Sequence, residues 1–175
     1  SFAALGLAFE CVSQGECERV IETIPGIDRQ KILFTPNFAP RSEYEWALEQ
    51  GVHLTLGNLY PLRHWPELFR GRDLLVRLDT GFGRGHHDHV RTAGVHSKFG
   101  VPLFELDELE RLAAAVGVKI VGLHAHTGSG VFDGRNWRQV GQLLGELAQR
   151  FPEVRAIDLG GGLGVPEKPG QVPVD

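Results

Sequence analysis

Two residue types are scarce in this 175-residue chain: it contains no methionine and only two cysteines, Cys11 and Cys17. So few cysteines cannot frame a disulfide-stabilised secreted domain, and we therefore expect reduced thiols and a cytoplasmic protein. Because a native start supplies a methionine, its absence predicts a processed chain or a piece of a larger one. Long apolar runs are absent too. None approaches the roughly 18 residues of a transmembrane helix, so we expect no membrane partner.

Long blocks of one charge are also missing. The chain has 18 Lys and Arg against 22 Asp and Glu, which gives a net charge of −4. Proteins that bind nucleic acid usually carry a basic patch, so we expect no nucleic-acid partner. Glycine, by contrast, is in excess at 23 of 175 residues, about 13% against an average of about 7%. No collagen-like period explains the excess, which therefore predicts glycines at turns and ligand-facing loops.

Apolar, β-rich runs alternate with helical patterns along the chain. The expected strands are residues 8–12, 32–35, 53–56, 74–78, 119–124 and 154–159, and the expected helices are residues 16–23, 42–50, 62–69, 105–116 and 137–150. Gly51 and Gly117 each end a helix directly before a strand, as in the tight returns of repeated βα units. This alternation predicts an α/β fold, either a doubly wound parallel sheet or part of a (β/α)8 barrel. Both architectures place their chemistry at the carboxyl ends of the strands.

The last expected strand has no helix after it. Only 13 residues follow Gly162, and they include Pro166, Pro169 and Pro173. Because prolines prevent a stable helix there, the final βα unit looks unfinished. The sequence therefore predicts a chain that stops in the middle of a fold.

The segment 122–130 is the strongest local signal for function. It continues an expected strand into a loop rich in glycine and serine. His124 and His126 are two residues apart and share a face on extended backbone. They could bind a metal, present flat imidazoles to a ligand, or simply form hydrogen bonds with polar neighbours at the mouth of a barrel. Ser129, together with the N–H groups that the flanking glycines leave accessible, suits an anion such as phosphate.

A run of three glycines, Gly160, Gly161 and Gly162, follows the last expected strand. Glycines at a strand end let the backbone approach a bound group and point N–H donors at it, although a tight turn has the same composition. The run is not a Gly-x-Gly-x-x-Gly motif, and no P-loop lysine follows it. Combined with the Ser129 loop one βα unit earlier, it predicts a second wall of one phosphate site.

Three further groups of residues suggest chemistry. Residues 83–89 contain three histidines and an aspartate, but zinc sites usually need ligands fixed by rigid elements, so we expect no metal there. Cys11 and Cys17 lack Cys-x-x-Cys spacing and are expected to be structural thiols. Arg77 lies inside an expected strand, where an unpaired charge is costly. It therefore either pairs with an acid such as Glu10 or faces an anionic ligand.

Taken in order, several of these segments resemble the diaminopimelate decarboxylases, a family of fold-type III pyridoxal-phosphate enzymes related to ornithine decarboxylase and alanine racemase. The segments are residues 9–16 (Phe-Glu-Cys-Val-Ser-Gln-Gly-Glu), 77–78 (Arg-Leu), the Gly-His loop 83–94, 97–100 (Ser-Lys-Phe-Gly), 122–129 and 160–163. The resemblance covers nearly the whole chain. The Gly-His loop followed by Ser-Lys-Phe-Gly is the part most specific to the diaminopimelate branch, and it accounts for the loop histidines without a metal.

The resemblance implies a partial (β/α)8 TIM barrel of the alanine racemase-like type, with pyridoxal 5′-phosphate as cofactor. The residues that it places at the cofactor are His126, Ser129, Gly160, Gly161, Gly162 and Arg77. By the family pattern His126 would stack on the pyridoxal ring, while Ser129 and the three glycines would hold the phosphate. The reaction would be decarboxylation of meso-2,6-diaminopimelate to L-lysine, the last step of bacterial lysine synthesis. The whole enzyme would add a C-terminal β-domain and act as a homodimer on this small amino acid.

The chain departs from the family at one decisive point. The enzymes need a Schiff-base lysine at the carboxyl end of the first barrel strand, and the lysines here are Lys31, Lys98, Lys119 and Lys168. None fits: two lie at expected strand starts, one in the Ser-Lys-Phe-Gly segment and one in the tail. We therefore expect no catalytic residue in this chain. Residues 1–175 would form part of a pyridoxal-phosphate-binding barrel domain, inactive alone, without the first strand and the C-terminal β-domain.

Two alternatives stay open. One is a decarboxylase-like homologue that has lost its lysine and serves as a regulatory or binding protein. The other is a metal-dependent barrel hydrolase that uses His124 and His126, with Asp158 as a candidate further ligand. Such hydrolases usually carry a His-x-His pair on the first strand, whereas here the pair lies on the fifth expected strand.

Overall fold

The computed structural model describes residues 2–81 and 98–174, which are built around one parallel sheet. Its strands are β1 (Phe9–Cys11), β2 (Ile32–Phe34), β3 (His53–Leu56), β4 (Asp73–Asp79), β5 (Val101–Pro102), β6 (Lys119–His124) and β7 (Ala156–Asp158). The helices are α1 (Gln14–Thr23), α2 (Arg41–Gln50), α3 (Tyr60–His64), α4 (Pro66–Phe69), α5 (Leu106–Val116) and α6 (Arg135–Ala148), with 3-10 turns at Ala3–Leu5, Arg29–Lys31 and Leu103–Glu105.

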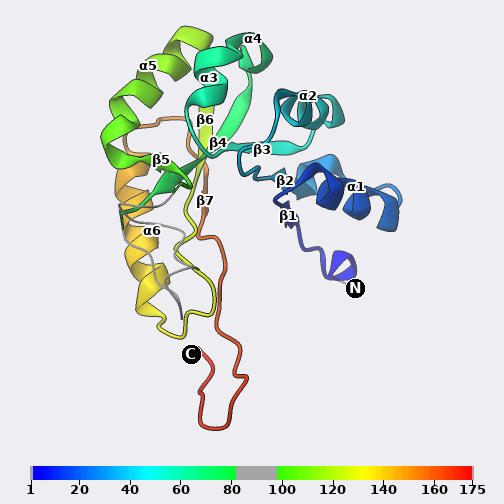
Figure 1. Cartoon of the computed structure of the whole chain (residues 1–175), viewed down its shortest axis with the longest axis vertical. Helices are drawn as coiled ribbons and strands as arrows, with labels where there is room; N and C mark the ends of the chain where they lie inside the picture. The colour runs from blue at the N-terminus through cyan, green and yellow to red at the C-terminus, as the bar shows by residue number, and fades with distance from the viewer. Residues whose placement is uncertain (1, 82–97, 175) are drawn as a thin grey trace.

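The strands follow one another across the sheet in the order of the chain. The order is β1-β2-β3-β4-β6-β7, every pair is parallel, and the two-residue β5 pairs with the end of β4. A doubly wound sheet reverses its order at a switch point, and this sheet does not. Because βα crossovers are right-handed, an unreversed order puts the helices on one face, and the sheet curls around the other. Figure 1 shows the helices along the outside of an arc. The partial (β/α)8 barrel is confirmed, and the doubly wound alternative is wrong.

The expected elements agree with the structure except at one helix. All six expected strands are present, and residues 53–56 and 119–124 match β3 and β6 residue for residue. The single helix expected at 62–69 is wrong, because α3 and α4 are separated by Trp65 with φ −132° and ψ 44°. Pro66 follows Trp65, and the residue before a proline is pushed out of the helical region. Strand β5 escaped prediction because two residues carry no periodicity.

Glycines end two helices as expected. Gly51 after α2 and Gly117 after α5 take left-handed φ values of 69° and 78°. This conformation is accessible to glycine without strain, and it turns the chain directly into β3 and β6.

The hydrophobic core lies between the outer face of the sheet and the helices. It includes Phe34, Leu54, Leu74, Leu123, Tyr44, Leu109 and Leu144, all at most 1% exposed. Fully burying one such side chain stabilises the fold by about 1.5–3 kcal/mol. In β4 the core residues alternate as Leu74, Val76 and Leu78, so Arg77 faces the opposite, concave side of the sheet.

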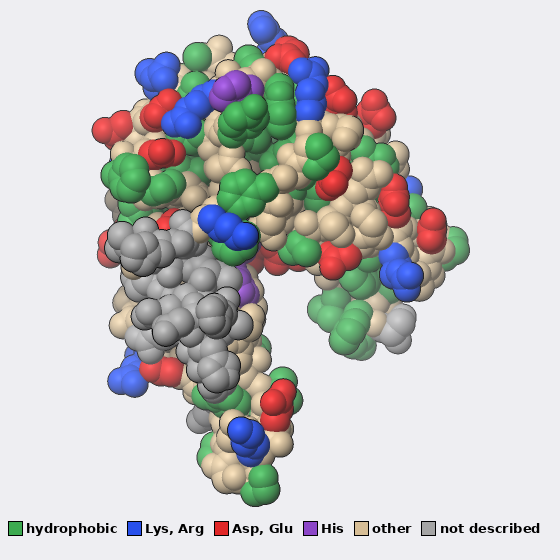
Figure 2. All heavy atoms as spheres, in the orientation of Figure 1, with side chains coloured by type: hydrophobic (Ala, Val, Ile, Leu, Met, Phe, Trp, Pro, Cys, Tyr) green, Lys and Arg blue, Asp and Glu red, His purple; other side chains and the backbone are tan. Residues whose placement is uncertain are grey.

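The concave side opens between the N-terminal part of the chain and the segment that follows β7 (Figures 1 and 2). On the face that Figure 2 shows, acidic and basic side chains are interspersed. None of the helices in residues 2–81 and 98–174 combines the length and hydrophobicity of a membrane-spanning helix.

Candidate cofactor site

Three charged or titratable side chains form one row across the concave face, at the carboxyl ends of the strands. Arg77 of β4 is in register with His124 of β6, and His124 is in register with Asp158 of β7. Residues in register on neighbouring strands point to the same face, so these side chains are neighbours. Thr35 and Thr55 extend the polar lining, with their hydroxyl oxygens 3.3 Å apart.

Glu10 of β1 joins this row from the other end of the sheet. The Thr35 hydroxyl donates to Glu10 Oε1 at 2.9 Å, and His124 Nε2 lies 3.8 Å from the same oxygen. Strands β1 and β7 stand at opposite ends of the strand order. Even so, one ligand atom each from Glu10, His124 and Asp158 lies within 4.8 Å of the other two. The sheet therefore curls far enough to bring its first and last strands to one place.

Burial dominates the electrostatics of the row. It lowers the pKa of His124 to about 4, helped by the charges of Arg77 and His126 and opposed by Asp158. The His124 imidazole is thus neutral at pH 7. Burial and the nearby charge of Asp158 raise the pKa of Glu10, and burial lowers the pKa of the Arg77 guanidinium. These directions are typical of charges crowded in a poorly hydrated space.

Arg77 forms no ion pair with Glu10 in the described part of the chain. Its guanidinium instead donates to Asn37 Oδ1 at 3.1 Å and lies over the ring of Phe99, 4.9 Å from the centroid. Lys98 Nζ lies 5.3 Å from the same centroid. Direct pairing with Glu10, one of two expectations for this residue, is therefore wrong. An anionic ligand as its partner stays a prediction.

The two glycine-rich segments lie side by side at the carboxyl rim, as expected. The backbone N–H of Val131 donates to Gly162 O at 2.9 Å, and the N–H of Gly164 returns a bond to Val131 O at 2.8 Å. Trp137 in α6 adds a third contact, since its Nε1 donates to Gly161 O at 2.9 Å. Ser129 is exposed in the first segment. The loops after β6 and β7 are thus joined into one backbone surface.

Two of the three consecutive glycines are required by close packing. A Cβ on Gly160 would lie 2.6 Å from Ala125 O, and a Cβ on Gly162 would lie 2.0 Å from Gly128 O. Both positions also have left-handed φ values, 72° and 79°. A Cβ on Gly161, with φ 65°, would meet nothing within 4 Å. Any side chain at Gly160 or Gly162 would therefore push the two loops apart.

His126 is held between these loops by hydrogen bonds that lead back to Asp158. Its Nδ1 bonds to the carbonyl oxygen of Gly160. Because a carbonyl only accepts, Nδ1 carries the proton and the tautomer is set. The N–H of Gly160 in turn donates to Asp158 Oδ1 at 2.8 Å. His126 and His124 therefore have different surroundings: the first is tied to a loop carbonyl, and the second faces two carboxylates.

Sequence reasoning missed several residues of this site. Thr35 and Thr55 are buried at the concave face, and a threonine at the end of an apolar strand is the signal that could have revealed them. Asn37 and Trp137 lie in segments whose pattern gives no such signal. The Gly-His loop 83–94 and Ser97 lie outside the described residues.

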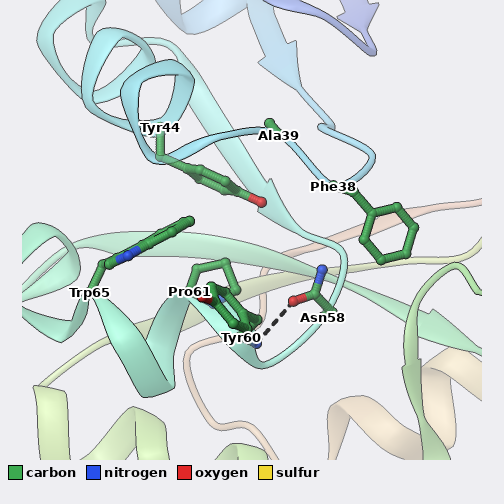
Figure 3. A pocket seen from close by; sticks show the side chains of 7 residues that line it. All are labelled: Phe38, Ala39, Tyr44, Asn58, Tyr60, Pro61 and Trp65. Carbon is green, nitrogen blue, oxygen red and sulfur yellow. Dashed lines mark hydrogen bonds between the residues drawn. The ribbon is translucent and has the colours of Figure 1, made fainter.

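A separate aromatic hollow of about 270 Å³ lies beside the segments that follow β2 and β3 (Figure 3). Its lining consists of Phe38, Ala39, Tyr44, Asn58, Tyr60, Pro61 and Trp65. The N–H of Tyr60 donates to Asn58 Oδ1 at 2.9 Å. The hollow shares no lining residue with the glycine loops or with the row of charges.

Comparisons with known proteins point to one family. The model of the pyridoxal-binding domain of pyridoxal-dependent decarboxylases matches residues 1–175. Diaminopimelate decarboxylase of Methanothermobacter thermautotrophicus is 35% identical over 97% of this chain and 41% of its own length. Ornithine decarboxylase of Neurospora crassa is 29% identical over 91% of this chain and 32% of its own.

Solved structures agree with these relatives. A crystal structure of diaminopimelate decarboxylase superposes with a TM-score of 0.85 at 28% identity, covering 99% of this chain and 42% of that one. The chain thus spans about two fifths of the length of the relatives it matches. The metal-dependent hydrolase alternative is excluded as a family assignment. Across its whole length, this chain matches the pyridoxal-binding domain of the pyridoxal-dependent decarboxylases, and it belongs to that family.

Proposed function

We propose that this chain is the cofactor-binding part of an enzyme that decarboxylates meso-2,6-diaminopimelate to L-lysine with pyridoxal 5′-phosphate. The diaminopimelate decarboxylases among its relatives support the substrate. The observation that carries the proposal is the pair of joined glycine loops beside an oriented imidazole, His126, at the carboxyl rim of the half-barrel.

The rim fits the cofactor in the chemistry of its donors. In the described residues, the N–H groups of Ser129, Gly161 and Gly162 have no acceptor, and a phosphate group needs several such donors. The Ser129 hydroxyl is exposed and adds one more. The proposed phosphate site also requires glycine at two positions, because a Cβ on Gly160 or Gly162 would collide with the neighbouring loop.

Each residue then has a part in binding and orientation. When bound, pyridoxal phosphate supplies a ring that takes up the electron pair released as carbon dioxide leaves. His126 would lie flat against that ring, with its orientation held by the Gly160 carbonyl. Ser129 and the glycine N–H groups would bind the phosphate. Arg77 would contribute a fixed positive charge near the ligand, because Asn37 holds its guanidinium in place.

The lysine that bonds covalently to the cofactor is proposed to come from a part of the protein outside these residues. Lys119 begins β6 and Lys31 directly precedes β2, so both stand at the amino ends of strands. Lys168 lies in the exposed segment after β7. Lys98 is at the carboxyl rim, but its Nζ lies over the rings of Phe38 and Phe99, 6.0 and 5.3 Å from their centroids. The chain alone is therefore proposed to be inactive.

We further propose that the whole protein is a cytoplasmic homodimer. The location is supported by Cys11 and Cys17, which are free thiols at 2% and 0% exposure. The dimer is supported by the family resemblance. Gel filtration with light scattering on the full-length protein tests the dimer, and a monomeric mass would contradict it.

A second candidate is a binding protein that has kept the cofactor site and lost the chemistry. It is favoured by one observation, the lack of a suitably placed lysine among the four in this chain. The reading frame upstream of Ser1 decides between the two. A strand with a lysine at its carboxyl end supports the enzyme, and its absence supports the binding protein.

The proposed cofactor site is tested with pyridoxine 5′-phosphate, which lacks the aldehyde and therefore cannot react with surface lysines. Tryptophan fluorescence is a suitable reading, because Trp137 contacts the glycine loop. We expect saturable binding at one site per chain. Ser129→Ala should weaken pyridoxine 5′-phosphate about tenfold, the effect of losing one charge-assisted hydrogen bond.

Pyridoxine, which has the same ring but no phosphate, is the control ligand. Ser129→Ala should leave its weaker binding unchanged, whereas His126→Ala should weaken both ligands because both have the ring. If Ser129→Ala lowered the affinity for both ligands equally, Ser129 would not belong to the phosphate site.

A second experiment tests the proposal that no lysine of this chain bonds covalently to the cofactor. Pyridoxal phosphate is added, any imine is reduced with borohydride, and the labelled lysine is identified by peptide mass. Stoichiometric labelling of Lys98 would refute it.

A further inference from the structure

Trp137 lies in the first turn of α6, and its indole bonds to the loop of three glycines that follows β7. Its Nε1 donates to Gly161 O at 2.9 Å. The preceding residue, Asn136, is 1% exposed and forms two hydrogen bonds with Thr127, of 3.1 and 2.9 Å. These bonds fasten the first turn of α6 to the loop after β6. The indole N–H is therefore held at a defined place beside Gly161.

All three carbonyl groups of the glycine run accept hydrogen bonds. Their partners come from three different segments: His126 Nδ1 for Gly160, Trp137 Nε1 for Gly161 and the backbone N–H of Val131 for Gly162. The N–H groups of Gly161 and Gly162, by contrast, have no acceptor within the described residues. The loop thus turns its acceptors toward the protein and leaves two donors for a ligand.

The geometry of the peptide bond links each held carbonyl to one of these donors. A peptide group is planar and trans, so the C=O of one residue and the N–H of the next point in opposite directions. Gly161 O and the N–H of Gly162 belong to the same peptide group. The hydrogen bond from Trp137 to Gly161 O therefore also sets the direction of the Gly162 N–H, which points away from the indole.

The middle glycine needs such a hydrogen bond more than its neighbours do. Close packing restricts Gly160 and Gly162, whereas a Cβ at Gly161 would meet nothing within 4 Å. Because glycine adopts positive and negative φ about equally readily, a glycine peptide group can turn over unless a hydrogen bond holds it. Among the described residues, the indole of Trp137 is the donor that holds Gly161 O.

We propose that Trp137 is a positioning residue of the phosphate site, whose indole holds the peptide group that aims the Gly162 N–H at the phosphate. This role rests on the proposed function, in which the glycine loop binds the phosphate of the cofactor. It assigns part of the phosphate affinity to a side chain that does not touch the ligand. When the Gly162 N–H donates to a phosphate, its peptide group is polarised and Gly161 O becomes a better acceptor. The two hydrogen bonds therefore strengthen each other.

Calorimetric titration of Trp137→Phe and of the parent chain tests this role, because phenylalanine keeps an aromatic ring and lacks the N–H. The ligands are pyridoxine 5′-phosphate, inorganic phosphate and pyridoxine. We expect Trp137→Phe to weaken both phosphate ligands about five- to tenfold, the effect of a poorly directed charge-assisted hydrogen bond. Pyridoxine binding should not change. Trp46→Phe, at a tryptophan of α2 that packs against the core, is the matched control and should leave all three affinities unchanged.

Nuclear magnetic resonance of the parent chain tests the same link without a substitution. During titration with inorganic phosphate, the indole N–H signal of Trp137 should shift together with the amide signal of Gly162, because both bond to one peptide group or belong to it. In Trp137→Phe the shift of the Gly162 amide should shrink while that of the Ser129 amide persists. A general loss of structure would instead reduce both shifts.

The outcomes separate this role from the proposed cofactor site. If the parent chain binds neither pyridoxine 5′-phosphate nor phosphate, both proposals are refuted. If the parent chain binds them and Trp137→Phe binds them equally well, or loses pyridoxine to the same extent, the cofactor site stands and the role of Trp137 is overturned. An indole signal that stays in place while the Gly162 amide saturates would also overturn it.

Discussion

The tightest backbone contact in the candidate site is between Gly162 and the carbonyl of Gly128, and Gly162→Ala tests it directly. The new Cβ would lie 2.0 Å from Gly128 O, whereas ordinary contacts begin at 3.4 Å, so the loops must separate by about 1.4 Å. The left-handed φ of 79° adds a cost of about 1 kcal/mol for any residue with a Cβ. Forcing atoms into a packed site typically adds about 1–3 kcal/mol.

The sum is a loss of about 3 kcal/mol in the free energy of unfolding, which for a chain of this size lowers the melting temperature by roughly 6–12 °C. Gly161→Ala is the matched control, since its φ of 65° carries the same conformational cost while its Cβ would meet nothing within 4 Å. We expect it to lower the melting temperature by only about 2–4 °C.

Thermal unfolding followed by circular dichroism measures both variants, and titration with pyridoxine 5′-phosphate measures the site. Gly162→Ala should lose ligand affinity as well as stability because the two loops no longer meet, whereas Gly161→Ala should bind nearly as the parent chain does. Equal melting temperatures for the two variants would refute the steric reasoning.

Two further predictions concern the scaffold around the site. Thr127 and Asn136 form two buried hydrogen bonds with each other, of 3.1 and 2.9 Å. Thr127→Val should therefore lower the free energy of unfolding, measured in urea, by about 1–3 kcal/mol. An unchanged free energy of unfolding would show that the pair does not stabilise the fold. Burial, with a smaller contribution from Glu43, raises the pKa of Tyr44 to about 12. The folded state therefore holds this proton more tightly than the unfolded chain, and stability should fall by up to about 3 kcal/mol as pH rises from about 10 to about 12. Tyr44→Phe should remove that fall and Tyr60→Phe, at an exposed position, should not; the same alkaline slope in both variants would contradict the assignment.

Local patterns were sufficient to predict most of the secondary structure. The apolar run at residues 74–78 predicts β4, and the glycines after α2 and α5 predict where the neighbouring strands β3 and β6 begin. The break at Trp65 was also available in the sequence, because Pro66 follows it, but the apolar pattern of the segment 62–69 concealed it. Errors of this kind are local.

What sequence reasoning could not supply was the curvature of the sheet. The two glycine loops follow β6 and β7, which are neighbours in the sheet, so their contact was predictable from the βα repeat. The meeting of Glu10 with Asp158 was not, because it depends on how far the six strands from β1 to β7 curl before the first approaches the last. Arg77 was expected either to pair with an acid such as Glu10 or to face an anionic ligand, and the structure bonds it to Asn37.

We propose that the joined loops after β6 and β7 hold the phosphate of a pyridoxal cofactor. Backbone amide NMR of the chain during titration with pyridoxine 5′-phosphate tests it most directly, because Ser129, Gly161 and Gly162 each report through their own N–H. We expect these three amide signals to shift most and to saturate together. The largest shifts at Asn58 and Tyr60 instead, in the aromatic hollow of Figure 3, would contradict it.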